Sequence, residues 1–476
     1  MSKSSLPLLI VATGPLLEEG SEFVSGQCLR TLHFVRPLWE AGQDVRLITI
    51  PIPGTETSEH RFSLRTLEME GRRYQAVGTS SMEAIIPPLR KLLRGGMFRA
   101  VVGINPYPAA LVAFCGPLEI PFWADLNGYT MAEGQTRSAR MNSDQDFPHF
   151  WRMEAQTLLT ADRFSTVTNR QADALYGELA MLGRFSRFTH EEPFAHAVPN
   201  AVYKLYADLK RSTTLPKELF REFGLDDVAS SEKLVLWSGG FNTWTNTALL
   251  VDAAERILGA VPNARIVCTG GPVKVHDDGT YIQFLERLEK MPHKDRVHLL
   301  NWTSLDRVLA LHARADCGIN VDGANSETRF GARNRLTNML GCGLPVVTTS
   351  GTEIADWIHH HQVGLVTPLN DAAAFAEAVI RTLQDESATD KRAKKGRKLA
   401  LSEFAPAATL PEFLQWCEAP IHAADHHQPP TAIRQKVETL LSGEYDDAFI
   451  ARASLHHLRQ KWPLRAWYSL KRLLKK

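Results

Sequence analysis

The most informative segment of the chain reads GINVDGANSETRFGARNRLTNMLGCGLPVVTT and runs from Gly318 to Thr349. Apolar runs at its two ends predict buried strands. Between them, the pattern predicts a helix from Asn334 to Leu340 that Gly341 and Gly343 end. A strand, a helix start and a second strand in this order are typical of a parallel α/β sheet.

The polar residues of this segment suit an anionic ligand. One acidic residue precedes three arginines: Glu327, then Arg329, Arg333 and Arg335. Free backbone N–H groups and the positive end of a helix attract a diphosphate, and arginine binds phosphate oxygens bidentately. The alternative is an ordinary strand-to-helix turn whose arginines are solvated.

Composition limits the class of protein. The chain has 476 residues, of which 44% are hydrophobic and 22% charged, and this favours a soluble protein with two domains. The net charge of +1 gives no overall basic field for nucleic acid. The six cysteines form no CxxC pair and are expected to be reduced, buried thiols of a cytoplasmic protein.

The N-terminal apolar run is short and is followed by Glu18 and Glu19 rather than by a small-residue cleavage site. We therefore expect a first buried strand from Leu6 to Ala12 and not a signal peptide. No segment approaches the ~18 apolar residues of a membrane span.

Short apolar runs alternate with helical patterns in both halves of the chain. This order predicts two α/β domains with parallel sheets that face a cleft. We expect an N-terminal domain over residues 1–200, a second domain over 201–402, and a C-terminal part over 403–476. Val198-Pro199-Asn200 is the expected crossing between the domains. The C-terminal part is expected to hold a return helix, a linker and a basic tail.

Five segments of the second half resemble the nucleotide-sugar domain of retaining GT-B glycosyltransferases of family 4. They are VPN at 198–200, LVLWSGGFNTWTNTALLVDAAERI at 234–257, RVHLLNWTSLDRVLALHARADCGINV at 296–321, LTNMLGCGLPVVTT at 336–349 and SGTEIADWIHHHQVGLVTPLNDAAAFAEAV at 350–379. The resemblance implies a GT-B fold and a nucleoside-diphosphate sugar as donor.

Two departures from the family pattern stand out. The family carries two glutamates eight positions apart, but here Asn338 occupies the second position and Phe330 the first. The resemblance then implies that Glu327 takes the first role and that Asn338 bonds ribose hydroxyls. The family's basic residues after the first strand are replaced by a segment that includes Asn242 and Trp244.

The resemblance also implies how the donor is held. Glu327 would position the sugar, while Arg333, Arg335 and Arg329 would bind the diphosphate. Donor contacts are further expected from the two loops after the strands and from the base pocket, at Gly239, Gly240, Asn242, Asn301, Trp302, Thr352 and Glu353.

Transfer is expected to need no metal and no cofactor. The chain has no Asp-x-Asp loop and no evident cluster at metal-ligand spacing, and adjacent residues of the run His359–His361 would not face one site. Cationic side chains and a helix start can neutralise the leaving diphosphate instead. The resemblance implies retention of anomeric configuration, with the leaving phosphate taking the proton of the acceptor.

In the first half, Asp125 lies at the end of an expected strand, where α/β sheets place ligand groups. It is a candidate catalytic residue that would contact the acceptor or the sugar; the alternative is a turn cap before Asn127-Gly128. Glu133 and Arg137 are expected to form a solvated helical pair.

The C-terminal tail, QKWPLRAWYSLKRLLKK at 460–476, predicts a basic amphipathic helix that suits an anionic membrane surface. The alternative is a helix docked on the first domain. Membrane contact would favour a lipid-linked acceptor over a free glycan and a position on the inner face of the membrane. The altered glutamate pair keeps a non-catalytic binding subunit open as a rival function, and a nucleotide-sugar epimerase is a more distant one.

Overall fold

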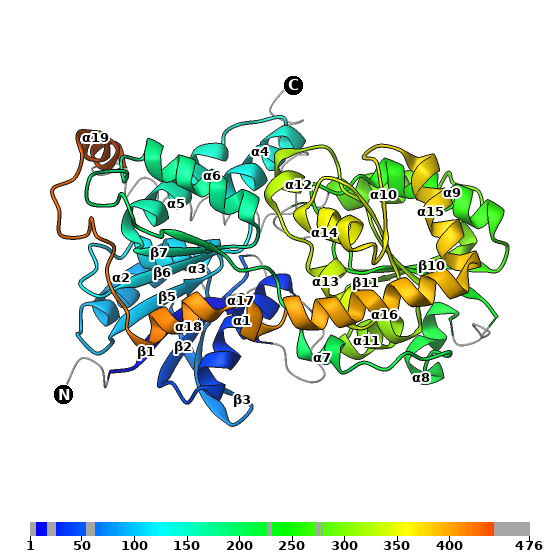
Figure 1. The fold of residues 1–476 in the computed structure, drawn as a ribbon, viewed down its shortest axis with the longest axis horizontal. Helices are drawn as coiled ribbons and strands as arrows, with labels where there is room; N and C mark the ends of the chain where they lie inside the picture. Colours follow the sequence, from blue (N-terminus) through cyan, green and yellow to red (C-terminus); the bar gives the residue numbers. More distant parts are fainter. Residues whose placement is uncertain are drawn as a thin grey trace, which may run out of the picture.

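Two sheets, each covered by helices, form the two halves of the molecule in the computed structural model (Figure 1). The structure describes residues 6–16, 25–53, 62–225, 231–272, 277 and 279–441. Within these ranges, no helix combines the length and the apolar character that a bilayer span requires.

The first domain is built on an eight-stranded sheet with the order β3-β4-β2-β1-β5-β6-β7-β8. All neighbouring strands are parallel except the β3–β4 hairpin. The strands are β1 (Leu8–Gly14), β2 (Val45–Pro51), β3 (Leu64–Met69), β4 (Arg72–Val77), β5 (Ala100–Ile104), β6 (Phe122–Leu126), β7 (Arg163–Thr166) and β8 (Ala195–Ala197). Its main helices are α1 (Gly26–Glu40), α2 (Met82–Leu93), α3 (Pro106–Ala113), α4 (Thr130–Met141), α5 (Phe147–Thr160) and α6 (Asn169–Met181).

The second domain is built on a six-stranded parallel sheet with the order β11-β10-β9-β12-β13-β14. The strands are β9 (Lys233–Trp237), β10 (Ala264–Thr269), β11 (Val297–Asn301), β12 (Cys317–Asn320), β13 (Val346–Thr349) and β14 (Leu365–Thr367). The helices include α7 (Lys204–Ala207), α8 (Lys217–Phe220), α9 (Thr247–Ala260), α10 (Gly279–Leu288), α11 (Leu305–Arg314), α12 (Ser326–Phe330), α13 (Asn334–Gly341), α14 (Glu353–His361) and α15 (Ala372–Gln384).

The central strands are buried because they are apolar on both faces. Every residue of β1, β5 and β6 is buried, as parallel strands between two helical layers require. β1 lies between β2 and β5 in register, with Leu8 opposite both Val45 and Ala100. Side chains cap many of the helix starts; Thr168, for example, accepts the N–H of Gln171 at the start of α6.

The chain crosses between the domains twice. After β8 it passes through residues 198–203 into the second domain, and after α16 (Glu386–Glu403) it returns (Figure 1). The two crossings touch, because the N–H of Val202 donates to the carbonyl oxygen of Phe404 at 3.0 Å. Gly341 is needed beside this junction, since a Cβ there would lie 2.2 Å from a methyl group of Val202.

The returning segment packs on the first domain. It forms two short helices, α17 (Pro406–Thr409) and α18 (Pro411–Glu418), rather than one return helix, because a proline starts each of them. Phe413 and Trp416 of α18 pack edge-on against Trp123 of β6. α19 (Ala432–Leu441) follows and lies beside α5 and α6 in Figure 1.

Residues 419–431 are docked on the first domain, although their sequence is typical of a linker. Asp425 is 7% exposed and forms a bidentate ion pair with Arg184, at 2.9 and 2.7 Å. The predicted basic tail lies outside the described residues.

Candidate active site

The candidate site lies at the carboxyl ends of the central strands of the second sheet. β9 pairs with both β10 and β12, so the strand order reverses at this point. Crevices outside such a reversal are where open α/β sheets bind ligands. The loops after β9, β10 and β12 meet here, and α13 begins beside them.

Arg333 is the centre of a buried ionic network. Its Nε donates to Asp322 Oδ1 at 2.8 Å, and its Nη1 and Nη2 donate to the two oxygens of Glu327 at 3.0 and 2.7 Å. The three side chains are at most 4% exposed. Glu327 and Arg333, predicted to bind sugar and phosphate separately, therefore bind each other.

The network carries one more negative than positive charge when its members are ionised. Burial lowers the pKa of Arg333, but Asp322 and Glu327 more than offset this and raise it above its usual range. Burial raises the pKa of Glu327, and the charge of Arg333 opposes that shift. Arg333 thus serves to hold two carboxylates in place, which leaves it little capacity to bind a phosphate.

Arg335 differs from Arg333 in its contacts. Its Nη2 donates to the carbonyl oxygen of Gly240 at 2.9 Å, and its guanidinium lies 4.1 Å from the ring centroid of Trp237. Its buried Nη1 has no hydrogen-bond partner among the described residues. Burial foremost lowers the pKa of Arg335 to about 10, with the charge of Asp322 opposing this shift and that of Arg333 adding to it, so the group is still a cation at neutral pH. No carboxylate forms an ion pair with it within the described part of the chain.

Two glycine loops lie against each other next to Arg335. Gly270, after β10, has a φ of +76°, and a Cβ there would lie 2.4 Å from the carbonyl carbon of Gly239. Gly239 itself approaches Arg335, since a Cβ on it would lie 3.5 Å from Nη2. The TGG sequence after β10 was not singled out from the sequence, although a glycine pair at the end of a buried strand is a signal for close backbone approach.

The expected base pocket adjoins the β10 loop. A Cβ on Gly271 would lie 3.4 Å from Asn301 Oδ1 and 3.7 Å from Trp302. Asn301 accepts the hydroxyl of Tyr281 at 2.6 Å, and Trp302 donates to the carbonyl oxygen of Pro272 at 2.8 Å. These bonds fix both side chains at the edge of the loop.

Thr352 and Glu353 lie at the start of α14, where they already have protein partners. Thr352 is fully buried, and its hydroxyl accepts the N–H of Ala355 as a helix cap. Glu353 reaches across to the first domain: it accepts the N–H groups of Asn169 and Arg170, each at 3.2 Å, and the side-chain amide of Asn169 at 2.8 Å. A carboxylate at the start of α6 is favourable, and here it joins the two domains.

Other contacts close the same side of the domain boundary. The hydroxyl of Thr168 donates to the carbonyl oxygen of Phe330 at 2.8 Å, and Ser326 donates to Gln135 at 2.8 Å. The rings of Tyr129 and Phe330 meet edge-on at 4.9 Å. α12, which carries Glu327, is therefore held against α4 and α6.

Asp125 is placed by β6 in the interior of the first domain and not on the domain boundary. It forms a bidentate ion pair with Arg30, at 3.0 and 2.7 Å, and accepts the hydroxyl of Ser165 at 2.7 Å. Both members of the ion pair have fully buried side chains. Arg30 also donates to the carbonyl oxygen of Val198, so the pair fixes the first crossing.

Glu133 does not form the predicted solvated pair with Arg137, which instead lies 3.5 Å from Asp146. It faces the second domain, where burial foremost and then the charge of Glu327 raise its pKa to about 8. The pKa values of Glu154 and Glu178 are also raised, chiefly through burial, and the charges of Glu178 and Glu133 add to the shift of Glu154. The i, i+4 spacing of Glu133 and Arg137 did not predict that three glutamates, Glu133, Glu154 and Glu178, would have raised pKa values here.

The remaining predicted donor residues are spread around this centre. Arg329 is exposed on α12 and Asn242 is partly buried in the loop after β9. Asn338 is buried on α13, where its side-chain oxygen accepts the N–H of Tyr203 at 3.3 Å. Asn338 also lines a cavity of about 390 Å³ between α1, the first crossing and α17.

Residues 232–385 match the family model described as Glycosyl transferases group 1. Among curated proteins, YtcC of Bacillus subtilis (strain 168) is 25% identical over 202 residues, which are 42% of this chain and 47% of that protein. The chain spans about half the length of the curated relatives it matches.

Solved structures show the same architecture. Sucrose-phosphate synthase of Thermosynechococcus elongatus has a TM-score of 0.65 at 16% identity, over 86% of this chain and 98% of that chain. HepE of Anabaena in complex with UDP-glucose has a TM-score of 0.59 at 12% identity, over 86% of this chain and 98% of that chain. The chain therefore has the GT-B fold of glycosyltransferases, and residues 232–385 of its second domain carry the sequence pattern of the group 1 glycosyl transferases.

Proposed function

We propose that this protein is a glycosyltransferase that moves a sugar from a nucleoside-diphosphate sugar to a glycan or lipid-linked acceptor. The proposal rests on Arg335, a cation that lies against the glycine loop after β9 and forms no ion pair with a carboxylate among the residues that the structure describes. A buried N–H without an acceptor is unfavourable, and a phosphate oxygen would satisfy it. HepE, which shares the fold, was solved with UDP-glucose.

The donor would span the loops described above. The diphosphate would bind Arg335 and backbone N–H groups of the glycine loops and of the α13 start. The base would pack beside Asn301 and Trp302, and the sugar would contact Glu327. Arg333 becomes a positioning residue for Glu327 in this proposal, which revises the phosphate-binding role expected from the sequence.

We further propose transfer with retention and without a metal at the reaction centre. The bond between the anomeric carbon and the phosphate oxygen breaks, and its electron pair stays on the diphosphate. The acceptor oxygen bonds to the same face of the anomeric carbon, and its proton passes to the leaving phosphate. Arg335 and the α13 start supply positive charge where negative charge develops.

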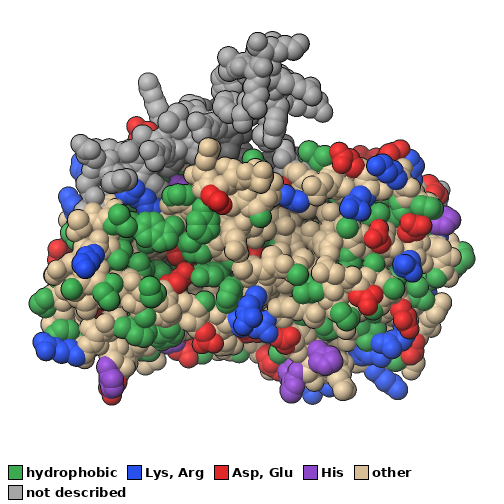
Figure 2. Space-filling view, turned by 90° about the horizontal axis from the view of Figure 1, so that it is seen from above, with side chains coloured by type: hydrophobic (Ala, Val, Ile, Leu, Met, Phe, Trp, Pro, Cys, Tyr) green, Lys and Arg blue, Asp and Glu red, His purple; other side chains and the backbone are tan. Residues whose placement is uncertain are grey.

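We propose a cytoplasmic protein that contacts the inner face of the membrane through the basic tail. Support comes from α19, which precedes the tail and exposes Ile433 by 55% and Leu440 by 60%. Figure 2 shows hydrophobic side chains gathered on the half of the molecule that the first domain forms. An exposed apolar surface on the first domain and a basic sequence after α19 would both suit a lipid-linked acceptor.

A non-catalytic binding subunit is the rival function that one observation favours. Asn338 stands where the family has its second glutamate, and it bonds the backbone of the first crossing. Such a protein would bind a nucleotide without transferring or hydrolysing its sugar. An epimerase would convert one donor sugar into another without an acceptor.

The test is titration calorimetry with UDP, GDP, ADP, dTDP and CDP and their sugars, on the full chain and on Arg335→Met. We expect one base to bind, and the variant to bind it roughly 10- to 150-fold more weakly, because charge-assisted hydrogen bonds contribute about 1.5–3 kcal/mol. Arg381→Met, which removes an exposed arginine of α15, is the matched control and should bind as the natural protein does.

Unchanged binding by Arg335→Met would refute the placement of the diphosphate. The donor that binds is then incubated alone, and the sugar product is followed by proton NMR. Release of a sugar with the donor's own anomeric configuration supports a retaining transferase. Binding without any turnover, in the presence of glycan and lipid-linked acceptors, supports the binding subunit.

A further inference from the structure

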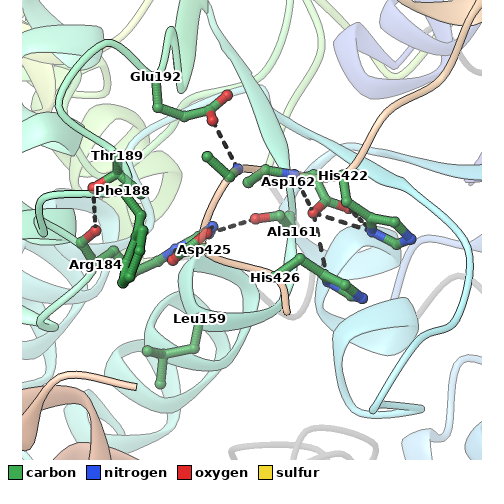
Figure 3. Close-up of polar contacts among 12 residues, drawn as sticks. Leu159, Ala161, Asp162, Arg184, Phe188, Thr189, Glu192, His422, Asp425 and His426 are labelled. Carbon is green, nitrogen blue, oxygen red and sulfur yellow. Dashed lines mark hydrogen bonds and ion pairs between the residues drawn. The ribbon is translucent and has the colours of Figure 1, made fainter. Parts of the chain in front are cut away.

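A carboxylate and two imidazoles come together where the returning segment docks on the first domain (Figure 3). Asp162 precedes β7, whereas His422 and His426 belong to the turn after α18. One ligand atom from each of the three lies within 4.8 Å of the others. His422 Nδ1 is 3.2 Å from Asp162 Oδ2, and His426 Nδ1 is 3.8 Å from Asp162 Oδ1.

The carboxylate of Asp162 is held rigidly. It is 2% exposed, and its two oxygens accept the N–H groups of Phe122 and Ala423, each at 2.8 Å. Both oxygens also lie within hydrogen-bond distance of His422 Nδ1, at 3.4 and 3.2 Å, so the carboxylate already faces an imidazole. Hydrogen bonds that fix a carboxylate in this way are typical of the groups around metal ligands.

The imidazoles are close together and accessible. The rings of His422 and His426 are stacked, with centroids 3.6 Å apart, and the ring of His427 meets that of His426 at 4.5 Å. The side chains of His422 and His426 are 20% and 22% exposed. They can therefore rotate, and water can reach them.

Neighbouring ion pairs fix the segment that carries these histidines. Asp425 binds Arg184 and, at 3.0 Å, Arg434. The N–H of Ala424 donates to Glu192 at 2.8 Å. The turn is thus positioned by contacts that do not involve the three candidate ligands.

We infer that Asp162, His422 and His426 bind one divalent transition-metal ion of the zinc class, with water completing the coordination. Two imidazoles and one carboxylate suit zinc and its neighbours, whereas magnesium and calcium prefer oxygen ligands alone. Ligands of a tetrahedral zinc ion lie roughly 3.3 Å apart for bonds of about 2.0 Å. The two distances from Asp162 to the imidazole nitrogens, 3.2 and 3.8 Å, are already close to this value, and small rotations of the two rings would complete the arrangement.

The ion would join the returning segment to the first sheet. Asp162 lies at the amino-terminal ends of β6 and β7, so the site is at the opposite edge of the sheet from the carboxyl ends. This inference does not rest on the proposed transfer reaction, and the ion would take no part in it.

The experiment uses the full chain without a polyhistidine tag, stripped with EDTA and dialysed. Zn²⁺ is titrated in by calorimetry, and the melting temperature is followed as Zn²⁺ is added. We expect one ion per chain and a melting temperature that rises with Zn²⁺ concentration. His422→Ala should weaken binding at least tenfold, and the double variant His422→Ala/His426→Ala should lose the one-to-one site.

The matched control is His359→Ala/His360→Ala, which removes two exposed histidines of α14 and should bind Zn²⁺ as the natural chain does. Uptake of less than one ion by the natural chain, or equal uptake by the double variant, would overturn the inference. Should the double variant fail to fold, Co²⁺ is added to the natural chain and to His422→Gln instead, and the visible absorption of the bound cobalt tests the site. Visible absorption of low-coordinate cobalt, displaced by Zn²⁺ and weaker in the variant, supports the site, and its absence from the natural chain refutes it.

Discussion

Replacing Arg333 with methionine is expected to destabilise the protein and not only to weaken ligand binding. The change removes three charge-assisted hydrogen bonds of 2.7–3.0 Å and leaves Asp322 and Glu327, both at most 4% exposed, without their cation. Breaking a buried ion pair costs about 3–5 kcal/mol. Glu327, whose pKa is already raised by burial, can take up a proton and recover part of this cost.

We therefore expect the free energy of unfolding to fall by about 4 kcal/mol. At about 2–4 °C per kcal/mol for a domain of this size, the melting temperature should fall by roughly 8–16 °C. Urea unfolding followed by circular dichroism measures the free energy, and a thermal scan measures the melting temperature.

A second variant tests the cause. Arg333→Met/Glu327→Gln removes one of the uncompensated charges, and we expect it to be more stable than the single variant by about 1–2 kcal/mol. Arg329→Met changes an exposed arginine of the same segment and should stay within about 0.5 kcal/mol of the natural protein. If Arg333→Met unfolds within about 1 kcal/mol of the natural protein, the network is not the stabilising feature that its geometry indicates.

Three further predictions concern other regions. The pKa of Glu133, raised from 4.5 to about 8, means that folding favours its protonated form. Its contribution to the free energy of unfolding is therefore fully present below pH 4.5 and is lost as the pH rises to about 8. Glu133→Gln should make the free energy of unfolding fall less over this range, by roughly 2 kcal/mol for a partly exposed group, and the same pH dependence of urea unfolding in both proteins would contradict this. Glu353→Gln should weaken the bridge to α6 by about 1 kcal/mol and speed hydrogen exchange at the N–H groups of Asn169 and Arg170, while unchanged exchange would show that the bridge is not maintained in solution. The full chain should sediment with anionic vesicles and a chain truncated after Leu441 should not; sedimentation of the truncated chain would exclude the tail as the anchor.

The sequence predicts the fold closely where local pattern is sufficient. Apolar runs such as that of β1 are buried on both faces, so their composition alone identifies them as central strands. α13 was predicted to within one residue, because glycines follow it and a buried strand comes next. Pro406 and Pro411 also predict helix starts, and each begins a short helix. The sequence prediction of a single return helix did not use this information.

Partners distant in sequence could not be predicted from spacing. Asp125 and Arg30 are separated by 95 residues, and Asp162 and His422 by 260. Each pair forms only because strands and the returning segment bring the two together. The predicted pair of Glu133 and Arg137 was wrong for the same reason. Glu133 is influenced by Glu327 of the second domain, and Arg137 lies beside Asp146.

The pairing of Glu327 with Arg333 was missed although only six residues separate them. Glu327 lies on α12, whereas Arg333 is the residue that precedes α13, so helical periodicity does not relate them. Gly331 allows the chain between them to fold back, and a Cβ on it would lie 2.1 Å from Glu327 Oε1. The residue types were thus identified from the sequence, but their roles depend on a local bend.

The contact between the two chain crossings has a mechanical consequence. Because Val202 and Phe404 are hydrogen-bonded, both connections pass through one small region, and relative motion of the domains is a rotation about it rather than a sliding of one over the other. α14, which carries Glu353, adjoins this pivot, because the ring of Trp357 lies 5.0 Å from that of Phe404 and its Nε1 donates to Glu403 at 2.8 Å. Glu353, at the start of the same helix, contacts α6 of the first domain. Substitutions at the pivot are therefore expected to alter the contact between the two halves without touching any ligand.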